Sequence, residues 1–184
     1  MSEEREENFF TELLKFVIVA AAIVIPVRIY VAQPFIVSGA SMEPTFENGE
    51  YLIIDELSYR IEEPKRHDVV IFRYPRNPSE FFIKRIIGLP GETVSVGEND
   101  ILITQKNGSE IKLDEQYVRN KGNGELLAVT LGEEEYFVMG DNRPASSDSR
   151  VWGTLPRENI TGRALLRLFP LQNFGIFPGA IKQP

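Results

Sequence analysis

The feature that most limits how this chain can fold is an apolar run near its N-terminus, between Lys15 and Arg28. The 12 residues between these cations carry no charge, whereas a membrane-spanning helix needs about 20 apolar residues. The aliphatic stems of both cations can lie in the bilayer while their charged ends reach the headgroups, which extends the usable length. Residues 13–32 would then form about 30 Å of helix. We therefore expect a transmembrane anchor there, after a polar tail at residues 1–12.

Two other interpretations of this run fit less well. A cleavable secretory signal needs a basic leading region and a small-x-small cleavage site, but the leading region is acidic and Tyr30-Val31-Ala32 is a poor site. A helix packed on a core would carry a polar stripe on its outer face, whereas this run is apolar on both faces. Lys and Arg occur on both sides of the run, so the positive-inside rule does not decide its orientation.

From Gln33 onward the pattern changes to short runs rich in Val, Ile, Phe and Tyr, separated by Gly, Pro and Asn. Runs of this length with turn residues between them are typical of β-strands. We therefore expect residues 33–184 to form a mainly β domain with an antiparallel sheet or barrel-like architecture. The expected strands lie at residues 51–55, 68–74, 80–89, 92–97, 100–104, 134–140 and 163–170.

The composition excludes several classes of site. The chain contains no cysteine, which removes disulfides, thiolate metal ligands and a cysteine nucleophile. Its one histidine is His67, so a multi-histidine metal site is excluded, and we expect neither a metal nor another cofactor. The net charge is −7 and no basic cluster exceeds Lys65-Arg66, so nucleic acid is not an expected partner.

The segment FIVSGASMEPTF, residues 35–46, is a bend rich in Gly and Ser with Ser41 at its centre. Gly39 and Ala40 keep the backbone flexible, and Pro44 restricts the backbone where the chain leaves the bend. Such a bend can expose a hydroxyl while directing backbone N–H groups at one point, as a nucleophile and its oxyanion hole require. The signal is weak by itself, because most Ser- and Gly-rich segments are only loops.

Lys84 lies in a second notable segment, FFIKRIIG, residues 81–88. If this segment is a strand, Lys84 shares one face with Phe82 and Ile86. The ordinary interpretation is a solvated lysine on an edge strand, where lysine is common. The alternative is a desolvated lysine. Burial can lower a lysine pKa by about 3–5 units, and the neutral amine could then take the proton of a serine.

A third segment, GDNRPASSDSRVWG at residues 140–153, is polar and contains two acidic and three basic or amide side chains close together. Ion pairs on the surface would account for this composition. A segment so rich in mutually compatible groups can also form a rigid support for a site, and one of its hydroxyls could orient the Lys84 amine. The charged residues in it are Asp141, Arg143, Asp148 and Arg150.

Together these segments resemble the type I signal peptidase (leader peptidase) family, whose members are Ser-Lys dyad serine proteases. SMEPT at residues 41–45 resembles the family's nucleophile box, and KRIIGLPGE at 84–92 resembles its lysine box. GDNRPASSDSR at 140–150 resembles a third box. PKRHDVVIF at 64–72 resembles the intervening one, except that His67 replaces the usual Gly. Each box is moderately specific; the set in this order is highly specific and covers nearly all of the chain.

The resemblance implies a role for each matching residue. Ser41 would be the nucleophile, Lys84 the general base, and Ser146 the hydroxyl that orients the lysine. The oxyanion hole would use the backbone N–H groups of Ser41 and Gly39, the latter at a position where some members have a serine hydroxyl. The remaining implied positions are the supporting residues Asp141, Asp148, Arg150 and Arg85, and the substrate-pocket residues Phe35, Val37 and Ile83.

The resemblance also implies a function and a location. The protein would be a membrane-bound serine endopeptidase that removes N-terminal signal peptides from exported preproteins through an acyl-enzyme. Its substrates would have small residues at positions −1 and −3 before the cut. The catalytic domain, residues 33–184, would lie on the outer face of a prokaryotic plasma membrane with an apolar surface on the bilayer. An accessory subdomain around residues 90–135 would be reduced to a few strands.

Three alternatives are weighed against this function. A self-cleaving repressor-type peptidase also uses a Ser-Lys dyad, but it would carry a DNA-binding domain, or an Ala-Gly or Cys-Gly cleavage site ahead of the serine. A triad through His67 is a different chemistry, but nothing places this residue near Ser41, and a lone histidine in a turn is usually solvated. A membrane-tethered β domain that only binds partners would need no buried lysine, and a serine-directed labelling reagent would distinguish it.

Overall fold

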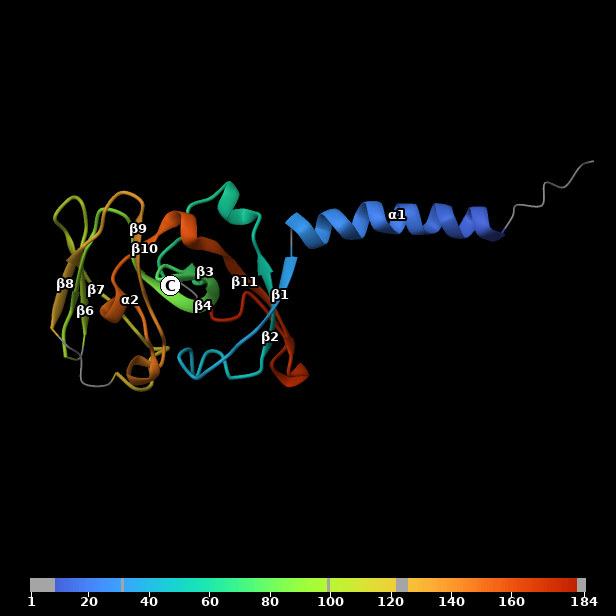
Figure 1. Cartoon of the computed structure of the whole chain (residues 1–184). Coiled ribbons are helices and arrows are strands. Elements are labelled where there is room, and N and C mark those ends of the chain that lie inside the picture. Colours follow the sequence, from blue (N-terminus) through green and yellow to red (C-terminus); the bar gives the residue numbers. More distant parts are fainter. Residues whose placement is uncertain (1–8, 31, 99, 122–125, 182–184) are drawn as a thin grey trace, which may run out of the picture.

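The computed structural model describes residues 9–30, 32–98, 100–121 and 126–181, without the side chains of residues 23, 25–30 and 32. One long helix, α1 (Phe9–Tyr30), precedes a part of the chain built from short strands (Figure 1). The main sheet contains β1 (Ala32–Ile36), β2 (Tyr51–Asp55), β3 (Val69–Tyr74), β4 (Asn77–Gly88), β9 (Glu135–Met139), β10 (Leu155–Pro156), β11 (Ile160–Phe169) and β12 (Gly175–Ile176). A second sheet contains β5 (Thr93–Val96), β6 (Ile101–Thr104), β7 (Glu110–Lys112) and β8 (Leu127–Thr130). The short helical turns are η1 (Ser58–Arg60), η2 (Arg143–Ala145), α2 (Ser149–Trp152), η3 (Arg157–Asn159) and η4 (Leu171–Asn173).

Pairing within both sheets is antiparallel throughout the described residues. The main sheet runs in the order β1-β2-β11-β3-β4-β9-β10, with β12 beside β11, and the second sheet in the order β7-β6-β5-β8. Short runs of β-branched and aromatic residues, bounded by Gly, Pro and Asn, favour strands of this length. The predicted mainly β, antiparallel fold is therefore confirmed.

Strand β3 shows why part of the sheet is apolar on both faces. Val70 and Phe72 point into one buried apolar cluster, while Val69 and Ile71 point into another, because successive side chains alternate across a strand. Burial on both faces removes the polar alternation that a half-exposed strand would show. Strand β4 pairs with β3 along most of its length and is thereby held between the same two clusters.

The second sheet packs against the main sheet through a third apolar cluster. Val94 and Ile103 contribute to this cluster from the second sheet, and Ile87 and Phe137 contribute from β4 and β9. Figure 1 shows the second sheet at the end of the molecule opposite to α1. Its strands fall within residues 90–135, the range for which the sequence predicts a reduced accessory subdomain. The second sheet thus supports β4, the strand that carries Lys84.

Helix α1 extends away from the sheets in Figure 1. Many of its described side chains are apolar and exposed, Phe10 and Phe16 among them. Within the part of the chain whose side chains are described, no helix is both long and apolar enough to span a membrane. The predicted anchor at 13–32 includes residue 31 and the side chains at 23, 25–30 and 32, which lie outside the described part, as do residues 1–8 of the predicted tail.

Candidate active site

Ser41 lies in a loop between β1 and β2 that is held at both ends. The N–H of Gly49 donates to the carbonyl oxygen of Val37 at 2.9 Å, which closes the loop on itself. The side chains of Met42 and Phe46 are buried in the apolar cluster beneath β2, β3 and β11. The loop that carries Ser41 is therefore anchored by backbone closure and by two buried side chains.

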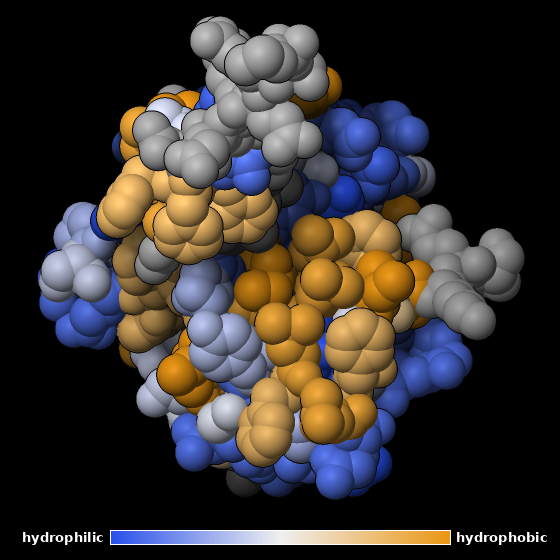
Figure 2. Space-filling model, turned by 90° about the vertical axis from the view of Figure 1, so that its right-hand side faces the viewer, coloured by the Kyte–Doolittle hydropathy of each residue, from blue (hydrophilic) through white to orange (hydrophobic). Residues whose placement is uncertain are grey.

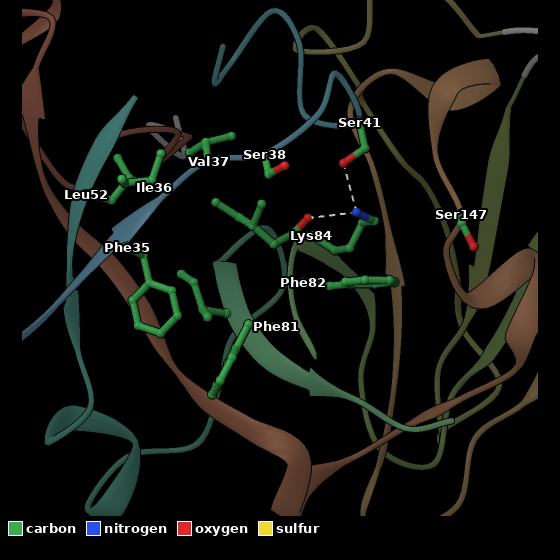
Figure 3. Close-up of a pocket in the computed structure, with 12 residues that line it drawn as sticks. Phe35, Ile36, Val37, Ser38, Ser41, Leu52, Phe81, Phe82, Lys84 and Ser147 are labelled. Atoms are coloured by element: carbon green, nitrogen blue, oxygen red, sulfur yellow. Dashed lines mark hydrogen bonds between the residues drawn. The ribbon is translucent and has the colours of Figure 1, made fainter. Parts of the chain in front are cut away.

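Lys84 reaches Ser41 from strand β4. Its Nζ lies 2.8 Å from the Ser41 Oγ and 2.9 Å from the carbonyl oxygen of Ile83, and it donates a hydrogen bond to each (Figure 3). The residue is 4% exposed, so the solvated edge-strand lysine considered from the sequence is wrong. Burial lowers the pKa of Lys84 to about 8, although the negative charges of Asp148 and Asp141 oppose this shift.

This pair can carry out proton transfer near neutral pH. A lysine with a pKa of about 8 is roughly one-tenth neutral at pH 7, whereas an unperturbed lysine is almost entirely protonated. The 2.8 Å between Lys84 Nζ and Ser41 Oγ is within hydrogen-bond reach for a general base. A serine hydroxyl beside a desolvated amine is the arrangement of hydrolases in which lysine replaces the histidine of a triad.

Ser146, which the resemblance assigns to orienting Lys84, lies beside the Ser41 loop without bonding to the lysine. Its Oγ is buried and has no hydrogen-bond partner among the described residues. A Cβ added to Gly140 would lie 2.3 Å from this oxygen and 2.4 Å from the carbonyl oxygen of Ser41, which shows how closely the two segments approach. The orienting role of Ser146 therefore stays a prediction.

Arg85 and Asp141 form a buried ion pair on the face of β4 opposite to Lys84. Arg85 Nε lies 2.9 Å from Asp141 Oδ1, and Nη2 lies 2.6 Å from Oδ2. Both side chains are 1% exposed. The hydroxyl of Thr45 donates to the same carboxylate at 2.5 Å, so the pair joins the Ser41 loop to the segment that follows β9.

Two further ion pairs hold the segment that follows β9. Arg150 Nε lies 2.8 Å from Asp148 Oδ1, as the resemblance implies, and Asp148 also accepts the N–H of Gly140 at 3.1 Å. The second pair joins Arg143 to Glu115, and both side chains are buried. Glu115 lies outside every motif, and sequence analysis missed it because no local pattern marks the partner of a buried arginine. Together these contacts brace the segment after β9 internally and tie it to the chain around Glu115.

The backbone around Ser41 differs from the implied oxyanion hole in one respect. The N–H of Gly39 donates to Asn48 Oδ1 at 2.9 Å, so the expected contribution of Gly39 is already taken by another acceptor. Gly39 has φ +88°, a conformation that favours glycine. The N–H of Ser41 makes no hydrogen bond to any residue that the structure describes. It is therefore the donor available to a developing oxyanion.

A cavity of about 240 Å³ opens beside Ser41 and Lys84 (Figure 3). Lys84 is the one charged residue on its wall within the described chain. Two aromatic rings, Phe35 from β1 and Phe81 from β4, meet edge to face across it, with 5.2 Å between their centres. The three residues predicted to form a substrate pocket all line it: Phe35, Val37 and Ile83. The other lining residues are Ile36, Ser38, Leu52, Ile71, Phe81, Phe82 and Ser147.

His67 occupies a different environment from the one expected for a turn histidine. Its ring is half-buried and packs edge-on against Tyr117, with 6.0 Å between the ring centres. Its φ is +73°, in the left-handed region that favours glycine. Burial and then the charges of Arg85 and Arg66 lower the pKa of His67. Among the described residues, no hydrogen bond joins His67 to Ser41, and no cluster of acidic or histidine side chains is suited to a metal ion.

Comparison with known proteins assigns the family. The pattern of the family described as signal peptidase, peptidase S26, matches residues 10–169. Probable signal peptidase I-2 of Synechocystis sp. is 37% identical over 179 residues, which cover 95% of this chain and 80% of that protein. Signal peptidase I of Leptolyngbya laminosa is 35% identical over 181 residues, covering 95% of this chain and 87% of that protein. A crystal structure of a signal peptidase I from Enterococcus faecalis aligns with a TM-score of 0.47 at 33% identity, covering 56% of this chain and 97% of that one. The chain belongs to the signal peptidase family, peptidase S26.

Proposed function

We propose that the chain is a serine endopeptidase that removes N-terminal signal peptides from exported preproteins, with Ser41 as nucleophile and Lys84 as general base. Membership of the signal peptidase family supports the activity. The observation that carries the choice of residues is the 2.8 Å hydrogen bond between Lys84 Nζ and Ser41 Oγ in a desolvated setting. The burial of the lysine favours the neutral amine, which is the form that a base requires.

The proposed reaction uses the chain's own groups and water. The neutral Lys84 amine takes the hydroxyl proton as Ser41 Oγ attacks the scissile carbonyl carbon, and the Ser41 N–H stabilises the oxyanion. The lysine then gives this proton to the departing amine of the mature protein, which leaves the signal peptide as an ester on Ser41. Water then attacks the ester carbonyl carbon as Lys84 takes its proton. The bond to Ser41 Oγ breaks, Lys84 returns the proton to this oxygen, and the signal peptide departs with a new carboxyl end.

The supporting residues divide into one that orients the amine and several that hold the loops. Ser146 is proposed to bond to the Lys84 amine when substrate is bound, because its buried hydroxyl has no other partner in the described chain and such bonds often tighten in the substrate complex. The pairs Arg85–Asp141 and Asp148–Arg150 are proposed to hold the two loops that meet at Ser41. Loss of these pairs should displace the site rather than remove a reacting group.

The membrane is proposed to cover the face around the cavity mouth. Figure 2 looks at the side from which α1 extends in Figure 1 and shows apolar residues gathered beside the helix. Ile36 of β1 and Phe169 of β11 are both paired with Tyr51 of β2, so they lie in one row across three strands. Residues at this end of the sheets that are apolar and exposed are Ile36, Phe81, Phe169, Leu171, Phe174 and Ile176. An apolar surface of this extent suits a lipid interface.

The transmembrane anchor at residues 13–32 is proposed on the sequence pattern and on the exposed apolar side chains of α1. With this anchor and the apolar face on one side of the molecule, the domain at residues 33–184 would rest on the bilayer with its cavity close to the surface. The proposed location is the outer face of a prokaryotic plasma membrane, where a preprotein emerges during export.

Removal of residues 1–32 tests the proposed anchor and the contact of the domain with the bilayer. The shortened chain should cut peptides more slowly and keep some affinity for vesicles, and a fully active chain that ignores lipid and detergent would contradict it.

The proposed substrates are preproteins with small uncharged residues at positions −1 and −3. The apolar cavity wall beside Ser41 supports this choice, because Phe35, Val37 and Ile83 offer no partner for a charge. Cleavage of a synthetic preprotein by the full-length chain in detergent tests the function, with Ser41→Ala as the control. Cleavage at the signal-peptide boundary by the wild-type chain alone is expected. Equal cleavage by the Ser41→Ala chain would show that another site or a contaminating protease cuts the preprotein.

A further inference from the structure

Asn142 donates hydrogen bonds to the backbone on both sides of Ser41. Its side-chain Nδ2 donates to the carbonyl oxygen of Ala40 at 3.0 Å. Its own backbone N–H donates to the carbonyl oxygen of Ser41, also at 3.0 Å. One residue on a distant part of the chain therefore fixes the two peptide units that flank the proposed nucleophile.

The first of these bonds controls the direction of a catalytic donor. The carbonyl of Ala40 and the N–H of Ser41 belong to the same planar trans peptide unit, in which they point in opposite directions. A donor that fixes the carbonyl therefore fixes the N–H. The N–H of Ser41 has no partner within the described chain, so no bond of its own determines where it points. A hydrogen bond to the carbonyl also polarises the peptide unit and strengthens the opposite N–H as a donor.

Asn142 is itself held rigidly enough to act in this way. Its neighbour Asp141 is fully buried in the ion pair with Arg85, and the carbonyl oxygen of Asn142 accepts the N–H of Ala145 at 3.1 Å. On the other side, Gly140 approaches the Ser41 carbonyl so closely that a Cβ there would lie 2.4 Å from its oxygen. The backbone at Asn142 is thus held by the buried Arg85–Asp141 pair on one side and by the close packing of Gly140 against the Ser41 loop on the other.

We infer that Asn142 is a positioning residue of the proposed peptidase, and that its amide aims the Ser41 N–H at the oxyanion of the tetrahedral intermediate. The inference rests on the proposed function. It explains how a single backbone donor can serve when the Gly39 N–H is bound to Asn48. A donor held in advance costs no rearrangement when negative charge develops, which is the property that makes an oxyanion hole effective.

The test compares two ligands that differ only in whether they form a tetrahedral adduct. A signal-peptide segment ending in an aldehyde forms an adduct with Ser41, whereas the same segment ending in an alcohol only occupies the cavity. The variant is Asn142→Leu, which keeps a side chain of similar size and the backbone N–H but removes the amide donor. The matched control is Asn159→Leu, which removes an equivalent bond from an asparagine Nδ2 to the Arg73 carbonyl oxygen, also 3.0 Å long.

For full-length Asn142→Leu in detergent we expect kcat to fall roughly 10- to 100-fold with KM almost unchanged, which is somewhat less than the loss of an entire oxyanion donor. The affinity for the aldehyde should fall by the same factor, and the affinity for the alcohol by less than about threefold. The ascending limb of the pH profile should stay in place because Lys84 is unchanged. The Asn159→Leu chain should match the wild type in every measurement. If Asn142→Leu does not fold, Asn142→Ala also removes the donor without adding apolar bulk.

The outcomes separate the inference from the function beneath it. A wild-type chain that neither cuts the preprotein nor binds the aldehyde more tightly than the alcohol would remove the proposed function. A wild-type chain that does both, together with an Asn142 variant that loses the same affinity for aldehyde and alcohol, would overturn the inference alone. The same holds if the Asn142 variant behaves like Asn159→Leu, because the amide would then only fasten a loop.

Discussion

The amine of Lys84 is 2.8 Å from the hydroxyl oxygen of Ser41, yet the two residues are 43 positions apart and lie on separate elements. The lysine comes from a strand buried between two apolar clusters, and the serine comes from a loop pinned to one of them. The same burial that brings these atoms together also favours the neutral amine. Proximity and basicity therefore have one structural cause, and both can be tested by substitution.

Ser41→Ala and Lys84→Ala should each lower kcat more than about 10³-fold while leaving the sheets folded, because a nucleophile and its base act as one unit. Lys84→Arg should fail equally, since the guanidinium stays protonated and cannot accept a proton. His67→Ala is the control and should stay active. Preprotein cleavage measures the loss of activity, and far-ultraviolet circular dichroism shows whether the sheets stay folded. A folded but inactive His67→Ala chain beside an active Lys84→Ala chain would overturn the assignment.

The pH dependence of kcat/KM should follow the deprotonation of Lys84. Burial lowers the pKa of Lys84 to about 8, so the rate should rise about tenfold per pH unit below pH 8 and level off above it. Burial lowers the pKa of His67. If His67 were the base, the ascending limb of the pH profile would therefore lie below the ordinary histidine pKa of about 6.5. A limb in that lower range that vanishes in His67→Ala would point to histidine as the base.

Lys84→Met should abolish cleavage and yet stabilise the fold at pH 7. A lysine whose pKa falls from 10.5 unfolded to about 8 folded carries its full burial cost below pH 8. This cost is about 3 kcal/mol from the pKa shift, and it disappears as the pH rises from 8 to 10.5, because the unfolded chain then also loses the proton. Thermal unfolding of both chains in detergent checks the sign. A gap in stability that widens from pH 7 to pH 10 would contradict it.

Much of the fold could be predicted because its signals are local. Short apolar runs between turn residues mark strands, and the alternation in β4 predicts that Lys84 and Arg85 face opposite sides. The structure has them bonded to different partners, Ser41 and Asp141. The alternation of side chains along β4 could not show whether Lys84 is solvated, because its burial depends on what covers the strand. That cover comes from residues far away in the sequence, such as Trp152 and Tyr136.

Other parts of the site could not be predicted because they depend on non-local backbone contacts. The bond between the Gly39 N–H and Asn48 joins two residues of one loop whose closure no motif describes. Asn142 lies beside Asp141 in a motif, but its importance becomes visible only when its amide meets the carbonyl of Ala40. The same limit applies to Glu115, because a carboxylate outside every motif gives no sign that it is buried against an arginine.

Gly140→Ala should reduce both stability and activity. The added Cβ would lie 2.4 Å from the Ser41 carbonyl oxygen and 2.3 Å from Ser146 Oγ, and the first of these is backbone that cannot rotate away. Overpacking of this kind costs about 1–3 kcal/mol and would push the Ser41 loop from the lysine. Gly175→Ala is the matched control, since its nearest neighbour is the Asn173 carbonyl oxygen at 3.8 Å. Equal melting temperatures and rates for the two variants would refute the predicted crowding.

Substrate choice should follow from strand geometry and from the wall of the cavity. Strand β9 pairs with β4 only from Arg85 to Gly88 among the described residues, which leaves the edge of β4 before Lys84 open to an extended substrate. Alternate side chains of such a strand share one face, so positions −1 and −3 enter the protein together while position −2 points away. Overpacking the cavity wall beside Ile83 with a large side chain costs about 1–3 kcal/mol, or roughly 5- to 150-fold in kcat/KM. A peptide series varied at each of the three positions should show steep losses with Leu or Phe at −1, clear losses at −3, and tolerance at −2. Efficient cleavage with Phe at −1, or selectivity confined to −2, would show that the substrate does not bind as a strand in this cavity.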